Sequence, residues 1–251
     1  MIPHVGCTAG QRWLAEILRE AITVDLTAPD PAENVRHRIM RALTVSHQLH
    51  EPVVEVMDAL WDLSMVNSSL GQAGQLALGT LSRQVSRTES DAIYLNLSSR
   101  LEMMRQSEAH VASLEASNTL LRALGNQGDE RLLDLLSAGY HTHDCVSLRE
   151  AAAHVVRRIS TPEAEERLLW VLRNDPNHTA QAMAMLALQH SERNNSLSVV
   201  ESVRDMLIAE NYLDPALEQR LMKHLMSEAP HMVEECRMAR EDAKRRQLVE
   251  D

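Results

Sequence analysis

The sequence predicts an all-α protein, and we expect its helices to stack as hairpins. The 251 residues include only eight glycines and eight prolines, so turn-forming residues are too few for a β-sandwich or barrel. The chain has no phenylalanine, and its apolar residues are chiefly Ala, Leu, Val and Met, which favour helices over pleated sheets. Apolar residues three and four positions apart recur along the chain, as they do on one face of a helix.

The first quarter of the chain contains three predicted helices joined by short turns. Apolar residues within 13–22 share one helical face. Asp30 is expected to cap the second helix, with Pro31 in its first turn. Pro52 opens the third helix, whose apolar positions fall between residues 53 and 63.

From about residue 67 onward the helices resemble one another and recur in pairs. The expected pairs are 71–85 with 94–104, 116–128 with 130–139, 147–159 with 161–172, and 177–189 with 196–209. The repeat length of about 30 to 45 residues indicates a right-handed α-solenoid of HEAT-like hairpins, and an irregular helical bundle is the alternative. Small residues in the first helix of each pair let the backbones approach: Ala77, Ala123, Ala152 and Ala184.

Local residues mark where several of these helices begin and end. Thr161 is expected to cap a helix that has Pro162 in its first turn. Gly125 and Gly128 are expected to terminate the helix before them. We expect one superhelical domain over residues 1–232, with the best-defined repeats in 68–190, and a charged helical tail over 233–251.

Composition excludes several functional classes. A net charge of -11 disfavours general binding to nucleic acid. Cys7, Cys145 and Cys236 are too few and too scattered for a disulfide framework, and no apolar run is long enough to span a membrane. No phosphate-binding loop or nucleophile motif is present, so we expect neither enzymatic activity nor a cofactor.

One loop contains residues of the type that bind metals. His141, His143 and Cys145 alternate along it, and imidazole and thiolate groups are ligands that zinc prefers. Their spacing matches no established zinc motif, so the competing interpretation is a polar connection between helices. We therefore predict no metal site and keep these three residues as weak candidates.

Residues 68–190 carry a resemblance to a known family. The stretch 120–128, LLRALGNQG, and the alanine-rich run 148–159, which closes on two arginines, occur in the same order as in that family. The chain resembles the helical domain of the large lipid transfer proteins, which include vitellogenin, apolipophorin and the microsomal triglyceride transfer protein. Arg122 stands where the family usually has lysine, and Gln127 where it has a small residue.

This resemblance implies a non-catalytic lipid-transport module whose concave side packs around a lipid-binding region or partner. It also implies a secreted protein or one in the lumen of the endoplasmic reticulum. The alternative is a HEAT-like scaffold for protein–protein contacts with no lipid role. The positions expected to be structural are Leu121, Ala123, Leu124, Gly125, Asn126, Arg149, Ala152, Arg157 and Arg158.

Three of these positions have a physical rationale of their own. Arg157 and Arg158 are expected at the C-terminal end of a helix, where they complement its dipole. Asn126 is expected to hydrogen-bond carbonyl groups at a hairpin turn. The many methionines of the second half suit either a surface for apolar partners or a core without phenylalanine.

Overall fold

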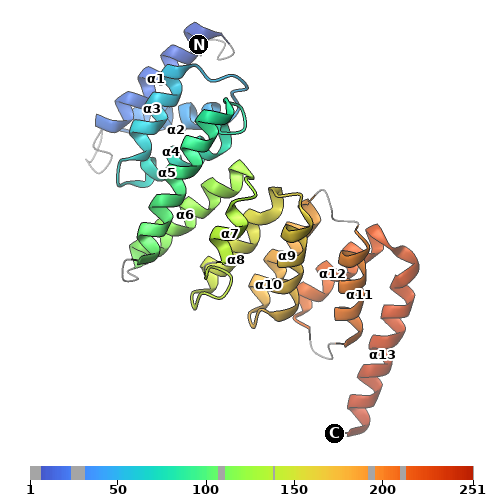
Figure 1. Ribbon diagram of the computed structural model, residues 1–251. Coiled ribbons are helices and arrows are strands. Elements are labelled where there is room, and N and C mark those ends of the chain that lie inside the picture. Colours follow the sequence, from blue (N-terminus) through green and yellow to red (C-terminus); the bar gives the residue numbers. More distant parts are fainter. Residues whose placement is uncertain are drawn as a thin grey trace. The chain divides into compact units, whose positions relative to one another are not determined.

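The computed structural model describes residues 7–23, 32–106, 111–137, 139–191, 196–209 and 213–250 (Figure 1). Over these residues the protein consists of 13 α-helices and two short 3-10 segments, with no strand. The all-α prediction is therefore confirmed. The chain divides into two compact units, Met1–Asp129 and Glu130–Asp251.

The helices of the first unit pack in sequential order. They are α1 (Thr8–Thr23), α2 (Ala32–Ser46), α3 (Val54–Ser64), α4 (Ser69–Leu81), α5 (Arg87–Gln106) and α6 (Val111–Gln127). Helix α1 packs against α2 and α3, helix α4 packs against α3 and α6, and α5 packs against α6. The expected cap Asp30 and the adjacent Pro31 lie outside the described residues.

The apolar faces predicted for α1 and α3 form the core of this unit. Leu14 and Leu18 of α1 and Leu60 and Leu63 of α3 are almost completely buried. These residues recur at the helical spacing from which the two helices were predicted. Helix α3 begins two residues after Pro52, and its N-cap residue Val53 has an extended backbone.

The second unit continues the sequential packing. Its elements are α7 (Leu132–Ser137), α8 (Val146–Val155), η1 (Val156–Arg158), α9 (Pro162–Asn174), α10 (His178–His190), α11 (Leu197–Ala209), α12 (Pro215–Glu228), η2 (Pro230–Met232) and α13 (Val233–Glu250). Helix α10 packs against α8, α9 and α12, and α11 packs against α9, α12 and α13.

Side-chain caps and ion pairs fix the ends and positions of these helices. The Thr161 hydroxyl accepts a hydrogen bond from the Ala164 amide, and Pro162 begins α9, as predicted. In α13, which covers most of the charged tail, Arg240 donates to the Leu207 carbonyl at 3.1 Å and pairs with Glu218 at 2.8 Å. The tail helix is therefore held against α11 and α12.

The predicted pairing of helices is wrong by one helix. The antiparallel neighbours that pack extensively are α3 with α4, α5 with α6, α9 with α10, and α11 with α12. The sequence pattern suggested α4 with α5 and α10 with α11. Of the helices that contain the recurring alanines, α4, α6 and α10 are therefore the second members of hairpins. Helix α4 packs on α6, and α8 packs on α10.

Small residues form the contact between α4 and α6. A Cβ atom built on Gly79 would lie 2.1 Å from the Ala123 carbonyl oxygen, so the two backbones touch. Ala77 and Ala123 are fully buried. Close approach of helix backbones is the role expected for small residues at such crossings. The contact between successive hairpins therefore explains Gly79 and Ala123.

The end of α6 also differs from the prediction. The helix continues through Gly125 and Asn126 to Gln127, so Gly125 does not terminate it and Asn126 lies in its last turn. Gly128 does terminate it: its φ angle is 73°, and its amide donates to the Leu124 carbonyl at 3.3 Å. A positive φ is easily adopted only by glycine, which explains why Gly128 and not Gly125 ends the helix.

Candidate functional site

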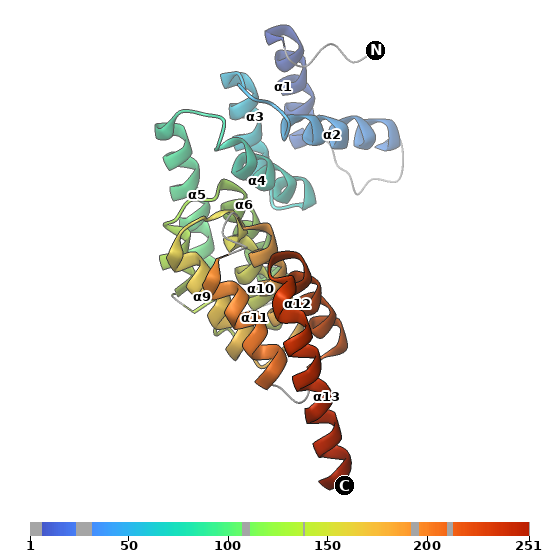
Figure 2. The same cartoon turned by 90° about the vertical axis from the view of Figure 1, so that its right-hand side faces the viewer.

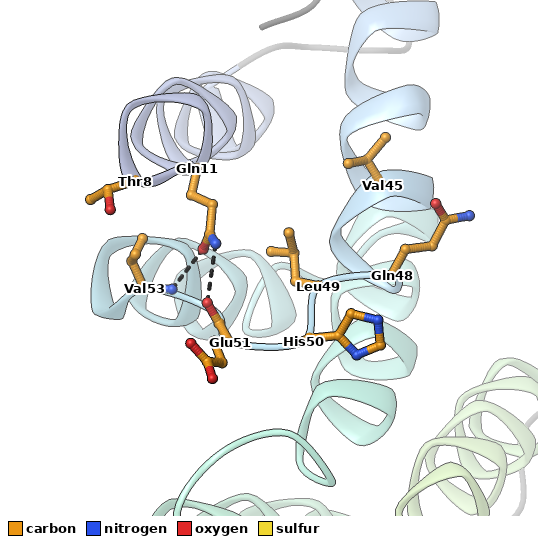
Figure 3. Close-up of a pocket in the computed structure, with 8 residues that line it drawn as sticks. All are labelled: Thr8, Gln11, Val45, Gln48, Leu49, His50, Glu51 and Val53. Carbon is orange, nitrogen blue, oxygen red and sulfur yellow. Dashed lines mark hydrogen bonds between the residues drawn. The ribbon is translucent and has the colours of Figure 1, made fainter. Parts of the chain in front are cut away.

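The first unit contains an open pocket of about 490 Å³ between α1, α2 and the segment that joins α2 to α3 (Figure 3). Thr8 and Gln11 line it from α1, Val45 lines it from α2, and residues 48–51 and Val53 complete it. Figure 3 shows the Gln11 side chain turned toward the backbone of the joining segment. Gln11 therefore holds the joining segment, which forms one wall of the pocket, in place.

Gln11 binds the joining segment through both ends of its amide. Its Nε2 donates to the Glu51 carbonyl at 3.1 Å, and its Oε1 accepts from the Val53 amide at 2.8 Å. The side chain is buried, so these bonds satisfy polar groups that would otherwise lack partners. Gln11 therefore has a structural role. Among the described residues that line the pocket, no nucleophilic side chain is hydrogen-bonded to a base.

The candidate metal loop of the second unit is arranged differently from a ligand set. The His143 Nδ1 atom accepts a hydrogen bond from the Cys145 amide at 2.9 Å. The Cys145 sulfur lies 3.1 Å from the Ser147 hydroxyl, whose hydrogen bond lowers the pKa of the thiol. No group of three or more His, Cys, Asp or Glu residues suited to a metal ion occurs among the described residues.

His141 is buried within this loop. The residue is only 9% exposed, and among the residues that the structure describes neither ring nitrogen has a hydrogen-bond partner. Burial, together with the positive charge of Arg167, lowers the pKa of His141 to about 4, although Asp175 opposes this shift. The imidazole is therefore neutral at physiological pH.

A buried ion pair lies at the base of the same loop. Arg149 of α8 bonds to Asp175, at the C-terminus of α9, through Nε–Oδ2 at 2.9 Å and Nη2–Oδ1 at 3.1 Å. Its Nη1 donates to the carbonyls of His143 and Asp144 at 2.7 and 3.2 Å. The guanidinium thus joins the loop, the start of α8 and the α9–α10 connection.

Of this network, Arg149 is predicted from the sequence as a structural residue, and Asp175 is not. Asp175 is buried, and its Oδ1 also accepts from the Asn177 amide at 2.9 Å. An acidic residue directly before a proline between two helices reads as an ordinary turn residue. Asp175 differs from such a residue only in its pairing with the buried Arg149, and the sequence does not show that Arg149 is buried.

The other positions expected to be structural are divided between core and surface. Leu121, Ala123, Leu124 and Ala152 are fully buried. In η1, Arg157 donates to the His154 carbonyl at 3.0 Å, and Arg158 is exposed.

The remaining candidate is the outer surface of α9 and α11. The exposed side chains there include Trp170, which is 47% exposed, and Leu197, which is 66% exposed. The two helices are joined by hydrogen bonds from Ser198 to Glu165 and from Arg173 to Ser202. An exposed tryptophan on a rigid helix pair is the kind of residue that dominates protein interfaces.

Comparison with known proteins adds no assignment. No protein-family model, curated protein or solved structure matches the chain. Within the part of the chain that the structure describes, none of the helices combines the length and the apolar character needed to cross a bilayer.

Proposed function

We propose that this chain is a non-catalytic scaffold that binds a protein partner, built as a right-handed α-solenoid of HEAT-like hairpins. In each unit the α-helices that pack extensively are one or two positions apart in the sequence. This is the contact pattern of stacked repeats, in which each hairpin contacts its neighbours only. Stacked hairpins present successive helices along one surface, which suits contact with another protein.

The observation that carries this proposal is the exposed pair Trp170 and Leu197 on neighbouring helices. Both side chains leave a large apolar area in water, and burial of apolar area is the dominant favourable contribution to most protein–protein association. Both also project from helices that are fixed by hydrogen bonds to each other. A rigid helix loses little conformational freedom when it binds a partner.

A lipid-transport module, as the family resemblance implies, is the second candidate. Among the described residues, methionine accounts for five of the nine large apolar side chains that are exposed: Met40, Met65, Met103, Met226 and Met238. Methionine is flexible and polarisable, so it adapts to apolar ligands of variable shape. This composition supports contact with lipid or with a lipid-binding domain.

A photo-crosslinking experiment tests the proposal. The chain would be expressed in its native cells with p-benzoylphenylalanine in place of Trp170, or in place of Leu95 as an exposed control in the first unit. We expect one protein to be captured from position 170. Stoichiometric lipid in the purified chain without a captured protein would favour the lipid candidate, and recovery of neither would refute both.

A further inference from the structure

Helices α9 and α11 run parallel, and hydrogen bonds join them at two levels. Ser198 donates to Glu165 near the start of both helices, and Arg173 donates to Ser202 further along (Figure 2 shows the two helices side by side). Trp170 lies between the two levels on α9, and Glu201 lies between them on α11. These two exposed residues therefore stand at about the same height along the helix pair.

Further exposed acids share the faces of these residues. Glu166 precedes Trp170 by four residues, and Asp205 follows Glu201 by four, and residues four apart lie on one side of a helix. Asp205 is paired with Arg204 at 2.7 Å. In the described part of the chain neither Glu166 nor Glu201 forms an ion pair; Arg204, which is paired with Asp205, also attracts Glu201 electrostatically.

The charge of the helix pair is negative. Helices α9 and α11 contain five carboxylates and three guanidinium groups. Of the guanidiniums, Arg173 is hydrogen-bonded to Ser202 and Arg204 is paired with Asp205. The chain as a whole has a net charge of -11, so its field also attracts cationic partners.

We propose that the outer surface of α9 and α11 binds an arginine- or lysine-rich segment of a protein partner, with a cationic side chain over Trp170. The indole face attracts a cation, and Glu166 and Glu201 supply carboxylates beside it. Leu197, exposed at the start of α11, offers an apolar contact to the same segment. This inference rests on the proposed scaffold function and specifies the chemistry of the partner.

The test measures binding of a fluorescein-labelled peptide of alternating arginine and leucine to the full chain. Fluorescence anisotropy at low ionic strength gives the affinity. We expect Trp170→Ala to weaken binding about fivefold, through loss of the cation–π contact. We expect Glu201→Arg to weaken it about tenfold, through charge repulsion.

Two controls separate this surface from general attraction to an acidic protein. Glu16→Arg makes the same charge change on an exposed residue of α1, and Leu95→Ala removes an exposed apolar side chain of α5. Both should retain wild-type affinity. Circular dichroism would verify the helical content of every variant, which should be unchanged because all four residues are exposed.

Three outcomes would overturn the inference. The first is that the wild-type chain fails to bind the peptide. The second is that the α9 and α11 variants bind it as well as wild type does. The third is that Glu16→Arg weakens binding as much as Glu201→Arg. A fourth result would overturn it as well, namely that a peptide with glutamate in place of arginine binds less than tenfold more weakly than the arginine peptide. The scaffold function fails separately, when crosslinking captures no protein partner.

Discussion

His141 makes the stability of the second unit depend on pH. The imidazole is buried and has no hydrogen-bond partner in the described part of the chain. Its pKa in the folded chain is about 4, against 6.5 in the absence of burial. Between these two values the unfolded chain binds a proton that the folded chain does not bind. The free energy of unfolding therefore falls as the pH falls from 6.5 toward 4.

The size of the effect follows from the shift. Each unit of pKa corresponds to about 1.4 kcal/mol, so the full shift amounts to about 3 kcal/mol. Lowering the pH from about 8 to about 5 spans most of this range and should cost about 2 kcal/mol through His141 alone. Because the pKa of His141 is lowered in the folded chain, its contribution to the free energy of unfolding is complete above pH 6.5 and decreases as the pH falls toward 4.

His141→Leu removes the titrating group and leaves an apolar side chain in the buried position. We expect the variant to be more stable than wild type by about 1 kcal/mol at pH 8, since two unpartnered ring nitrogens are replaced. We expect the advantage to grow by about 2 kcal/mol at pH 5. Urea unfolding followed by far-UV circular dichroism at both pH values measures both quantities.

A matched control is His190→Leu, which makes the same replacement at the exposed end of α10. On going from pH 8 to pH 5, this variant should lose as much stability as the wild-type chain does. Equal loss of stability in wild type and His141→Leu on acidification would refute the assignment of this pH dependence to His141.

Three further changes test the packing by thermal or urea denaturation. Arg149→Met should destabilise the protein by about 3–5 kcal/mol, because it leaves the Asp175 carboxylate buried without its cation; a loss below 1 kcal/mol would contradict the role of the pair. Gly79→Ala should cost about 1–3 kcal/mol, because its methyl group would overlap the Ala123 carbonyl, and wild-type stability would show that the seam can open. Thr161→Ala should cost about 1 kcal/mol through loss of the α9 cap, and Thr161→Ser should retain most of it.

The positions of the helices were predictable because they depend on local properties. The apolar spacing of α1 and the Thr161–Pro162 start of α9 are contained in a few consecutive residues, and both match the structure. The pairing of helices is not local. A buried alanine shows that another backbone is near, but the same alanine suits a partner in its own hairpin or in the next one.

The candidate sites were less predictable for the same reason. Arg149 and Asp175 are 26 residues apart, and nothing in either segment indicates that they meet. The loop around His141 contains polar residues that are typical of an exposed connection, whereas its first histidine is buried. The exposure of Trp170 was equally hidden, because a tryptophan within an apolar helix pattern is normally assigned to the core.

The backbone contact between α4 and α6 has a mechanical consequence. A slip of α4 along α6 by one helical turn, about 5.4 Å, would bring Gln75 to the place of Gly79, and its side chain would collide with the Ala123 carbonyl. Sliding of α4 in this direction is therefore blocked at this contact. A load that pushes α4 in this direction must deform the first unit at other helix contacts.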